Sequence, residues 1–268
     1  MPELPEVETV RLGLGHLPGR LVKGIVVRQE QLRWPVPKEV TSLKGQRITK
    51  LERRAKYLLL QADNGTAIIH LGMAGRLQFL SEAKPAGKHD HFDIILEHGC
   101  LRFTDPRRFG SLLWTAGRPE QHPLLRDLGP EPLGKGFSSD YLFQKSRKRS
   151  LAAKSFIMDS KIVAGVGNIY ASESLFQAGI RPSRPAGRLT RAECKRLVAA
   201  VRSVLANAIQ QGGTTLRDYR QSDGQPGYFQ QKLFVYGRGG QACRNCRGKI
   251  RSVRTGQRST FYCPNCQK

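Results

Sequence analysis

Acidic residues are scarce in this chain of 268 residues. Aspartate and glutamate number 21 against 45 lysines and arginines, which gives a formal net charge of +24 and a pI near 10.4. This excess is larger than solubility requires and indicates a polyanionic partner, of which nucleic acid is the first candidate. Charge alone leaves open a merely solvated or ribosome-like basic surface. An anionic membrane surface is less favoured, because no strongly basic amphipathic helix stands out.

Long apolar runs are also absent. The longest, such as YLLL at 57–60 and AIIHL at 67–71, fall far short of the roughly 20 residues that a membrane-spanning helix needs. The opening stretch MPELPEVETV is too acidic and too poor in apolar residues to be a signal peptide. With 39% hydrophobic residues the chain can still build a packed core, so we expect a folded cytoplasmic protein with no membrane partner.

Cysteine is nearly absent before residue 243. Only Cys100 and Cys194 occur there, which excludes a disulfide-rich secreted fold and predicts two small buried hydrophobic residues. The other four cysteines have the spacing of a zinc ribbon, C-x2-C-x16-C-x2-C, with the residues between the pairs forming a hairpin that turns near Thr255–Gln257. Four thiolates complete a tetrahedron, so we predict one structural zinc ion that stabilises a hairpin too small to fold alone. The predicted ligands are Cys243, Cys246, Cys263 and Cys266.

The order of patterns along the chain predicts two halves. Residues 1 to about 130 hold five β-rich runs, at 21–29, 45–61, 66–80, 91–105 and 110–115, separated by turn signals, which favours a sandwich or flattened barrel. The stretch LGPEPLGKGF at 128–137 is typical of an inter-domain linker.

Helical patterns follow the break. The segments 138–150 and 190–213 are predicted helices, the second with Thr190 and Glu193 as a capping box. Residues 214–231 are polar and predicted to be a long loop, a candidate lid. Gly165-Val166-Gly167-Asn168 precedes a further helical pattern, where Asn168 is a candidate N-cap and free N–H groups favour a phosphate.

Seven sequence features together resemble one family. They are PELPEVET, RRAKYLL, IHLGM, TDPRRFG, GVGNIYASE, QSDGQPGYF and the terminal four-cysteine ribbon, and they occur in order over essentially the whole chain. In these the chain resembles the formamidopyrimidine-DNA glycosylases, bacterial base-excision-repair enzymes.

The resemblance implies an α+β protein in three parts. These are an N-terminal two-layered β-sandwich with flanking helices at 1–130, a helix-two-turn-helix domain with a lesion-capping loop at 131–236, and a zinc finger at 237–268. It implies a monomer that binds duplex DNA in the cleft between the two halves. It further implies excision of oxidised purines, 8-oxoguanine and formamidopyrimidines, followed by strand cleavage through β- and δ-elimination.

The family's catalytic residues match positions near the start of the chain. The nucleophile falls on Pro2, exposed after removal of Met1, the acid/base carboxylate on Glu3, and a supporting carboxylate on Glu6. An α-amino group with a pKa of about 7.7–8.0 is roughly one-third unprotonated near pH 7.5, against roughly 0.1% for a lysine, so a terminal amine suits Schiff-base chemistry. The alternative for the carboxylates is an acidic helix start: Pro5 suits position N1, and Glu6 and Glu8 complement the helix dipole.

The family's DNA contacts match residues in both halves. Met73, Arg107 and Phe109 match the trio that fills the gap left by the flipped base, although Met73 and Phe109 taken by themselves are also typical of core packing. Arg217 stands in the capping loop, where many relatives have lysine. The residues that match the family's phosphate and DNA contacts are Lys56, His70, Lys154, Asn168 and Arg258. Lys56 and Arg258 are also predicted to belong to the catalytic site.

Two other functions remain open at this point. One is a glycosylase of the endonuclease VIII type, acting on oxidised pyrimidines. The other is a non-enzymatic nucleic-acid-binding zinc protein, which composition and the ribbon do not exclude.

Overall fold

The computed structural model describes residues 2–82, 84–212 and 233–268. The chain forms two compact units, divided between Arg126 and Asp127. The finer division of the second unit at residue 237 stays a prediction.

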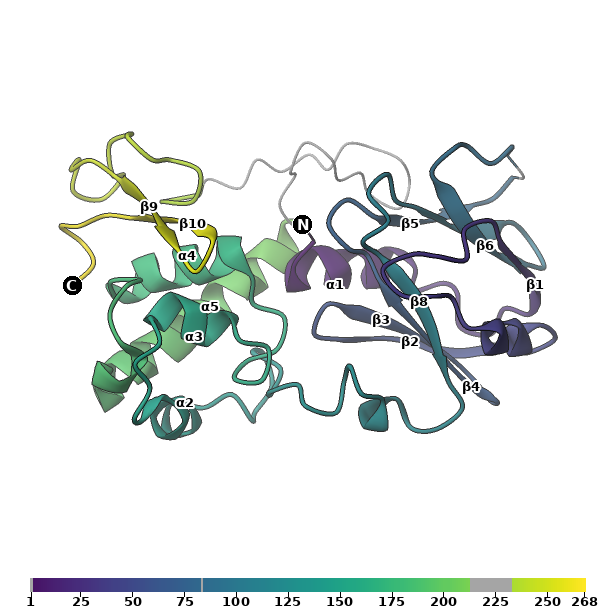
Figure 1. The fold of residues 1–268 in the computed structure, drawn as a ribbon, viewed down its shortest axis with the longest axis horizontal. Helices are drawn as coiled ribbons and strands as arrows, with labels where there is room; N and C mark the ends of the chain where they lie inside the picture. The colour runs from purple at the N-terminus through teal and green to yellow at the C-terminus, as the bar shows by residue number, and fades with distance from the viewer. Residues whose placement is uncertain (1, 83, 213–232) are drawn as a thin grey trace. The chain divides into compact units, whose positions relative to one another are not determined.

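The first unit is a sandwich of two four-stranded antiparallel sheets (Figure 1). One sheet has the strand order β1-β6-β7-β5 and the other β2-β3-β4-β8. The eight strands of the described residues in this unit coincide with the five β-rich runs to within one residue, which confirms the predicted sandwich. The elements are α1 (Leu4–Gly13), β1 (Val22–Val27), the 3-10 helix η1 (Lys38–Leu43), β2 (Ile48–Arg54), β3 (Tyr57–Ala62), β4 (Gly65–His70), β5 (Arg76–Leu80), β6 (Asp90–Leu96), β7 (Cys100–Thr104), β8 (Ser111–Thr115) and the 3-10 helix η2 (Pro119–Gln121).

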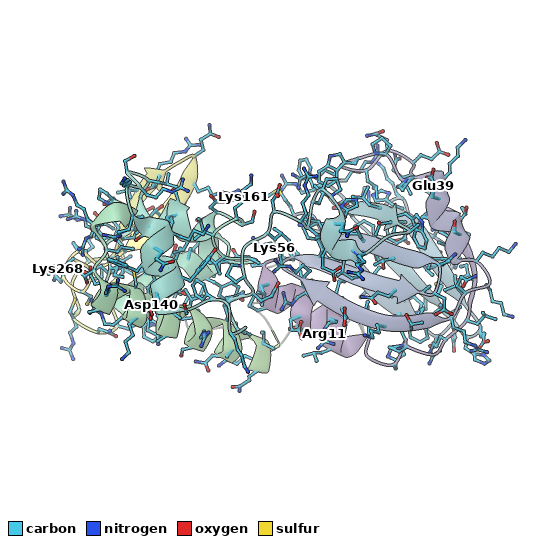
Figure 2. All side chains as sticks on the ribbon, turned by 90° about the horizontal axis from the view of Figure 1, so that it is seen from below. Arg11, Glu39, Lys56, Asp140, Lys161 and Lys268 are labelled. Carbon is cyan, nitrogen blue, oxygen red and sulfur yellow. The ribbon has the colours of Figure 1, made fainter. Side chains whose placement is uncertain are left out.

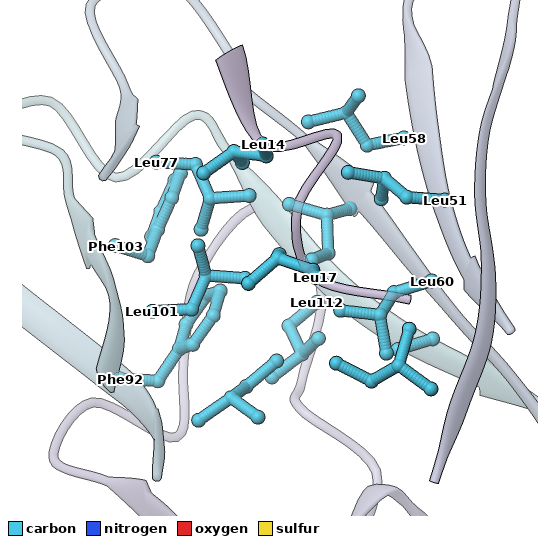
Figure 3. Packing of buried hydrophobic residues seen from close by; sticks show 14 of the residues in the cluster. Leu14, Leu17, Leu51, Leu58, Leu60, Leu77, Phe92, Leu101, Phe103 and Leu112 are labelled. Carbon is cyan, nitrogen blue, oxygen red and sulfur yellow. The ribbon is translucent and has the colours of Figure 1, made fainter. Parts of the chain in front are cut away.

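The core of this unit lies between the two sheets (Figure 3). Leu58 and Leu60 of β3 face it from one sheet, and Phe92 of β6 and Phe103 of β7 from the other. The two phenylalanine rings stack with centroids 4.8 Å apart. Alternate residues of a strand point to the same face, so Leu58 and Leu60 face the core together.

The second unit is helical and ends in a two-stranded hairpin. Helix α5 begins as predicted: the Thr190 N–H donates to the Glu193 carboxylate at 2.9 Å, and the Glu193 N–H donates to Thr190 Oγ1 at 3.2 Å. Cys194 is buried on α5, as Cys100 is in the sandwich. The elements are α2 (Ser139–Ser146), α3 (Ala153–Met158), α4 (Asn168–Ala178), the 3-10 helix η3 (Ala186–Arg188), α5 (Arg191–Gln210), β9 (Arg251–Thr255) and β10 (Arg258–Tyr262).

Two local predictions were wrong. The stretch 128–137 is an integral part of the second unit, because the guanidinium of Arg202 on α5 donates to the carbonyls of Pro132, Gly134 and Phe137 at 2.9–3.2 Å. Proline and glycine mark an irregular backbone, and here its carbonyls are satisfied by a side chain from a distant helix. The first predicted helix also stops earlier than expected, at Ser146.

No helix in the described parts of the chain combines the length and hydropathy needed to cross a membrane.

Candidate active site

The first turn of α1 places two buried carboxyl groups directly after Pro2. Glu3 is the N-cap, and the Glu6 carboxylate accepts a hydrogen bond from the Glu3 backbone N–H at 2.8 Å. Pro5 is therefore the second helical residue rather than the first. Pro2, Glu3 and Glu6 are all buried. The cap fixes the backbone of Glu3, and with it the position of the neighbouring Pro2.

Glu8 has a different role from its two neighbours. Its carboxylate bonds Arg11 at 2.6 Å and Arg53 on β2 at 2.8 Å. Burial alone would raise the pKa of Glu8, but the hydrogen bonds and charges of the two arginines outweigh it and the pKa is lowered. This ion-pair network holds α1 against the sheet, which agrees with a structural role for Glu8.

A cationic cluster lies at one end of the sheet that contains β2, β3 and β4. Lys56 occupies the turn between β2 and β3 (Figure 2), and His70 ends β4 opposite Tyr57. His70 is buried, and its Nδ1 accepts the Gly72 N–H at 2.9 Å. Burial, followed by the positive charges of Lys56 and Arg33, lowers the pKa of His70 to about 4. The ring is therefore neutral near pH 7, with its proton on Nε2, a donor suited to a phosphate oxygen.

The depressed pKa of His70 predicts a loss of stability in acid. The unfolded chain protonates this residue near pH 6.5 and the folded chain only near 4, so between these values the unfolded state binds more protons. Lowering the pH from 7.5 to 4.5 should cost about 2–3 kcal/mol of unfolding free energy through His70. The variant His70→Gln should lose this share of the pH dependence, measured by urea unfolding at the two pH values. His98→Gln, at an exposed position, should keep it, and an unchanged slope in His70→Gln would contradict the assignment.

Met73 and Phe109 lie on two adjoining loops and are exposed. Their side chains are 39% and 44% accessible, which excludes core packing. The two loops touch through Gly72, where an added Cβ would lie 2.4 Å from the Gly110 nitrogen and 2.5 Å from the Phe109 carbonyl carbon. The Arg107 guanidinium lies 5.1 Å from the centre of the Phe109 ring. The structure thus brings together the three residues that match the gap-filling trio.

Two predicted DNA-contacting residues meet in the second unit. The Lys154 ammonium donates to the Ser259 carbonyl and to Thr260 Oγ1, both at 2.8 Å, and Asn168 Nδ2 donates to the same carbonyl at 3.2 Å. Asn168 is the first residue of α4 and not its N-cap, which is Gly167. The prediction of an Asn168 cap was wrong because the amide bonds β10 instead. These bonds join α3, α4 and β10.

Arg258 is held next to this junction. It begins β10 directly after a two-residue turn in which Gly256 and Gln257 both have positive φ, 52° and 62°. This is the turn predicted from the sequence. The turn borders a surface pocket of about 240 Å³. The lining residues are Lys154, Ser155, Met158, Asp159, Thr255, Gly256 and Arg258.

The four predicted zinc ligands converge. Their sulfur atoms all lie within 4.8 Å of one another, with Cys243 and Cys266 3.9 Å apart and Cys246 and Cys263 3.4 Å apart. A tetrahedral ion with Zn–S bonds of about 2.3 Å separates its sulfurs by about 3.8 Å, so the cluster fits zinc. Burial raises the pKa of Cys263 and Cys266, whereas the backbone N–H of Gly248 lowers the pKa of Cys246 to about 7, so a cation is required to keep all four as thiolates.

Glu173 is a site residue that sequence reasoning missed. It is buried on α4, and its carboxylate accepts the backbone N–H groups of Phe234, Val235 and Tyr236 at 2.8–2.9 Å. The available signal was a lone glutamate within the apolar helix IYASESLF. Its bonds fix the segment that leads into the finger. Met1 and Arg217, which the sequence also singled out, lie outside the described residues.

Three family models match the chain in sequence order. They are the formamidopyrimidine-DNA glycosylase N-terminal domain over residues 1–112, the formamidopyrimidine-DNA glycosylase H2TH domain over 128–220, and a zinc finger found in FPG and IleRS over 240–268. Curated relatives named formamidopyrimidine-DNA glycosylase, from Stutzerimonas stutzeri and Pseudomonas putida, are 56% and 57% identical over 100% of both chains.

Solved structures agree with these matches. The MutM (Fpg) protein of Thermus thermophilus superposes with a TM-score of 0.88 at 40% identity, covering 99% of this chain and 98% of that one. Lactococcus lactis Fpg in complex with DNA containing an abasic site gives 0.91 at 32% identity, with full coverage of both chains. An Fpg mutant from the same organism, in complex with DNA containing Fapy-dG, gives 0.91 at 31%.

The chain belongs to the formamidopyrimidine-DNA glycosylase family. Membership confirms the predicted enzyme class, a bifunctional DNA glycosylase and abasic-site lyase of base-excision repair that acts on oxidised purines. It selects this function over the pyrimidine-directed and non-enzymatic alternatives. The predicted fold and the structural zinc site are confirmed as well.

Proposed function

We propose that Pro2 and Glu3 carry out the chemistry on a damaged purine in duplex DNA. One observation carries the proposal: among the described residues, Pro2 and the buried N-cap Glu3 directly precede the first helical turn, in a chain that is otherwise strongly basic. After Met1 is removed, the Pro2 nitrogen is a secondary amine, and Glu3 is the proton-carrying group beside it.

The reaction begins with attack of the Pro2 nitrogen on C1′ of the damaged nucleotide. The bond from C1′ to the base breaks and its electron pair leaves with the base, which takes up the proton that the Pro2 nitrogen loses. Glu3 protonates the ring oxygen as the sugar opens, and the amine becomes an iminium. The positive iminium acidifies the C2′ proton, so a base can remove it while the 3′ phosphate departs. A second elimination releases the 5′ phosphate, and water then frees Pro2.

The partner in this proposal is duplex DNA bound by one copy of the chain in the bacterial cytoplasm. Lys56 and the neutral His70 supply phosphate donors in the first unit. Asn168 and Arg258 supply them in the second. Lys154 acts by holding β10 in place beside Arg258. The net charge of +24 and the DNA complexes solved for Lactococcus lactis Fpg support this partner.

Met73, Arg107 and Phe109 open the duplex at the lesion. Unstacking a base costs a few kcal/mol, and apolar side chains inserted into the gap offset part of this cost. Phe109 is the wedge between base pairs and Met73 fills the space beside it. The planar guanidinium of Arg107 faces the base left without a partner.

A substrate comparison tests this function. Duplexes with a single 8-oxoguanine opposite cytosine, or a single thymine glycol opposite adenine, are incubated with the enzyme, and free base and cleaved strand are measured separately. We expect 8-oxoguanine to be excised and the strand cut, with much slower excision of thymine glycol. Equal or preferred excision of thymine glycol would overturn the assignment to purines.

The two alternatives for Glu6, catalytic support or helix cap, give different predictions. If the role of Glu6 is only to accept the Glu3 N–H at the start of the helix, Glu6→Gln should keep most of the excision rate, because the amide oxygen still accepts this hydrogen bond. Glu6→Ala removes the acceptor and should cost about 1 kcal/mol of stability, with a several-fold loss in kcat.

Single-turnover excision and thermal unfolding of both Glu6 variants provide the check. A loss of rate in Glu6→Gln as large as that in Glu6→Ala, with normal stability, would show that the negative charge itself is required.

A further inference from the structure

The turn that presents Arg107 and Phe109 is organised around a buried side chain. Asp105 follows β7 and is fully buried. Its Oδ1 accepts the Arg107 N–H at 3.1 Å and its Oδ2 accepts the Gly110 N–H at 2.8 Å. One carboxylate therefore bonds two backbone N–H groups of the six-residue turn 105–110. This turn carries the exposed side chains of Arg107 and Phe109.

The backbone of this turn is one that the chain would not adopt readily by itself. Arg108, at its centre, has φ +56°, a region that costs a non-glycine residue about 1 kcal/mol or more. The Arg108 N–H donates to the Asp105 carbonyl at 3.3 Å. Local strain persists only where the surroundings determine the conformation, and here the determining group is Asp105.

Asp105 is itself held from behind by the segment that begins β6. His91 is buried, and its Nε2 lies 2.6 Å from the Asp105 carbonyl oxygen, so this nitrogen carries the proton and donates it. The Asp105 N–H donates to the His89 carbonyl at 2.9 Å. On the opposite side the turn packs against Gly72, as described above.

We propose that Asp105, braced by His91, is a positioning residue for base extrusion: it holds the turn 105–110 in the conformation that presents Phe109 and Arg107 to the duplex. The inference rests on the proposed function, in which Phe109 is the wedge. Neither Asp105 nor His91 touches DNA in this scheme. Because the turn is ordered before DNA arrives, insertion of Phe109 does not have to offset the ordering of six residues at the moment of binding.

A double-mutant cycle distinguishes this role from general support of the fold. Asp105→Asn keeps the size of the side chain but leaves one of the two N–H groups facing an amide instead of an oxygen. We expect Asp105→Asn and Phe109→Ala each to lower kcat/KM for excision from duplex DNA by about 30-fold, and the double variant to be within about threefold of Phe109→Ala alone. The extrusion step is followed with 2-aminopurine placed beside the lesion, whose fluorescence rise should be slowed in all three variants.

Cleavage of a single-stranded abasic oligonucleotide is the control reaction, because this substrate has no base pair for Phe109 to open. It should stay within about threefold of wild type in Asp105→Asn, which shows that the fold and the Pro2 chemistry are intact. Asp63→Asn, an exposed change on the β3–β4 turn, is the matched control and should alter none of these rates. His91→Gln, which retains a donor at a similar reach, should be close to wild type, whereas His91→Ala should behave like Asp105→Asn.

Each result points to a different conclusion. If Phe109→Ala leaves duplex excision unchanged, the wedge assignment in the proposed function fails. If Phe109→Ala is impaired but Asp105→Asn alone has no effect, the positioning role fails while the wedge assignment stands. The same conclusion follows if the losses of the two single variants add in full in the double variant. Equal losses on duplex and single-stranded substrates in Asp105→Asn would show a merely structural residue.

Discussion

A chain that retains Met1 should form no adduct with abasic-site DNA that borohydride can trap. In that chain the Pro2 nitrogen is an amide, without a basic electron pair, so it can neither attack C1′ nor form an iminium. We expect trapping and strand cleavage to fall by at least about a thousandfold, which corresponds to about 4 kcal/mol in the activation barrier. The measurement is gel analysis of the trapped complex, with mass spectrometry to locate the modified residue.

Two matched variants complete this experiment. Pro2→Gly keeps a terminal amine but changes its substitution and rigidity, and should slow trapping without abolishing it. Pro5→Ala alters the other proline of the same stretch and should leave trapping near wild type. Binding of abasic DNA should survive in the chain that retains Met1. Trapping at wild-type level in that chain would refute the proline mechanism, and mass spectrometry would then distinguish the Met1 α-amine from an internal lysine as the nucleophile.

Removal of zinc should produce the second large effect. The finger has a small core, in which Val235, Ile250 and two of the cysteines pack against Phe176 of α4. So little apolar area does not stabilise a hairpin, whereas binding of structural zinc contributes about 10–16 kcal/mol in zinc-finger peptides. Without the ion, β10 should lose its order, and the Lys154 and Asn168 bonds to Ser259 should be lost with it.

The expected result is a loss of DNA affinity of at least about a hundredfold, because several charge-assisted contacts of about 1.5–3 kcal/mol each depend on the finger. Cys263→Ala or chelation should give this loss, measured by DNA titration together with zinc released per chain. Cys100→Ala, a buried cysteine outside the cluster, should keep one zinc per chain and full affinity. Retention of affinity by a zinc-free chain would show that the finger does not position Arg258.

The zinc cluster and the sandwich were predictable from the sequence for simple reasons. The cysteine spacing is local, since each C-x2-C pair brings two thiolates together whatever surrounds it. The β-rich runs each carry apolar residues that a strand has to bury, and a two-layered sandwich buries them between its sheets. The capping box of α5 was equally local, and it is present as Thr190 and Glu193.

The errors arose where a distant segment competes for a local group. Asn168 was expected to cap α4, but β10 supplies a carbonyl from about ninety residues further along the chain, and the amide bonds it. The stretch 128–137 has the composition of a linker, but Arg202 satisfies its carbonyls. A pattern within a short window contains no information about such partners.

The sequence by itself determined the chemistry available to this protein: an amine and carboxyl groups at the start of the chain, four thiolates at its end, and a surface rich in cations. The tertiary structure decided which of these groups act together. It made Glu8 an ion-pair partner of Arg53, and it left Met73 and Phe109 exposed instead of buried. It also placed Asp105 and His91 behind the turn that carries Arg107. The physical reason is that burial, hydrogen-bond partners and strain depend on segments that fold against one another, and these are properties of the packed chain.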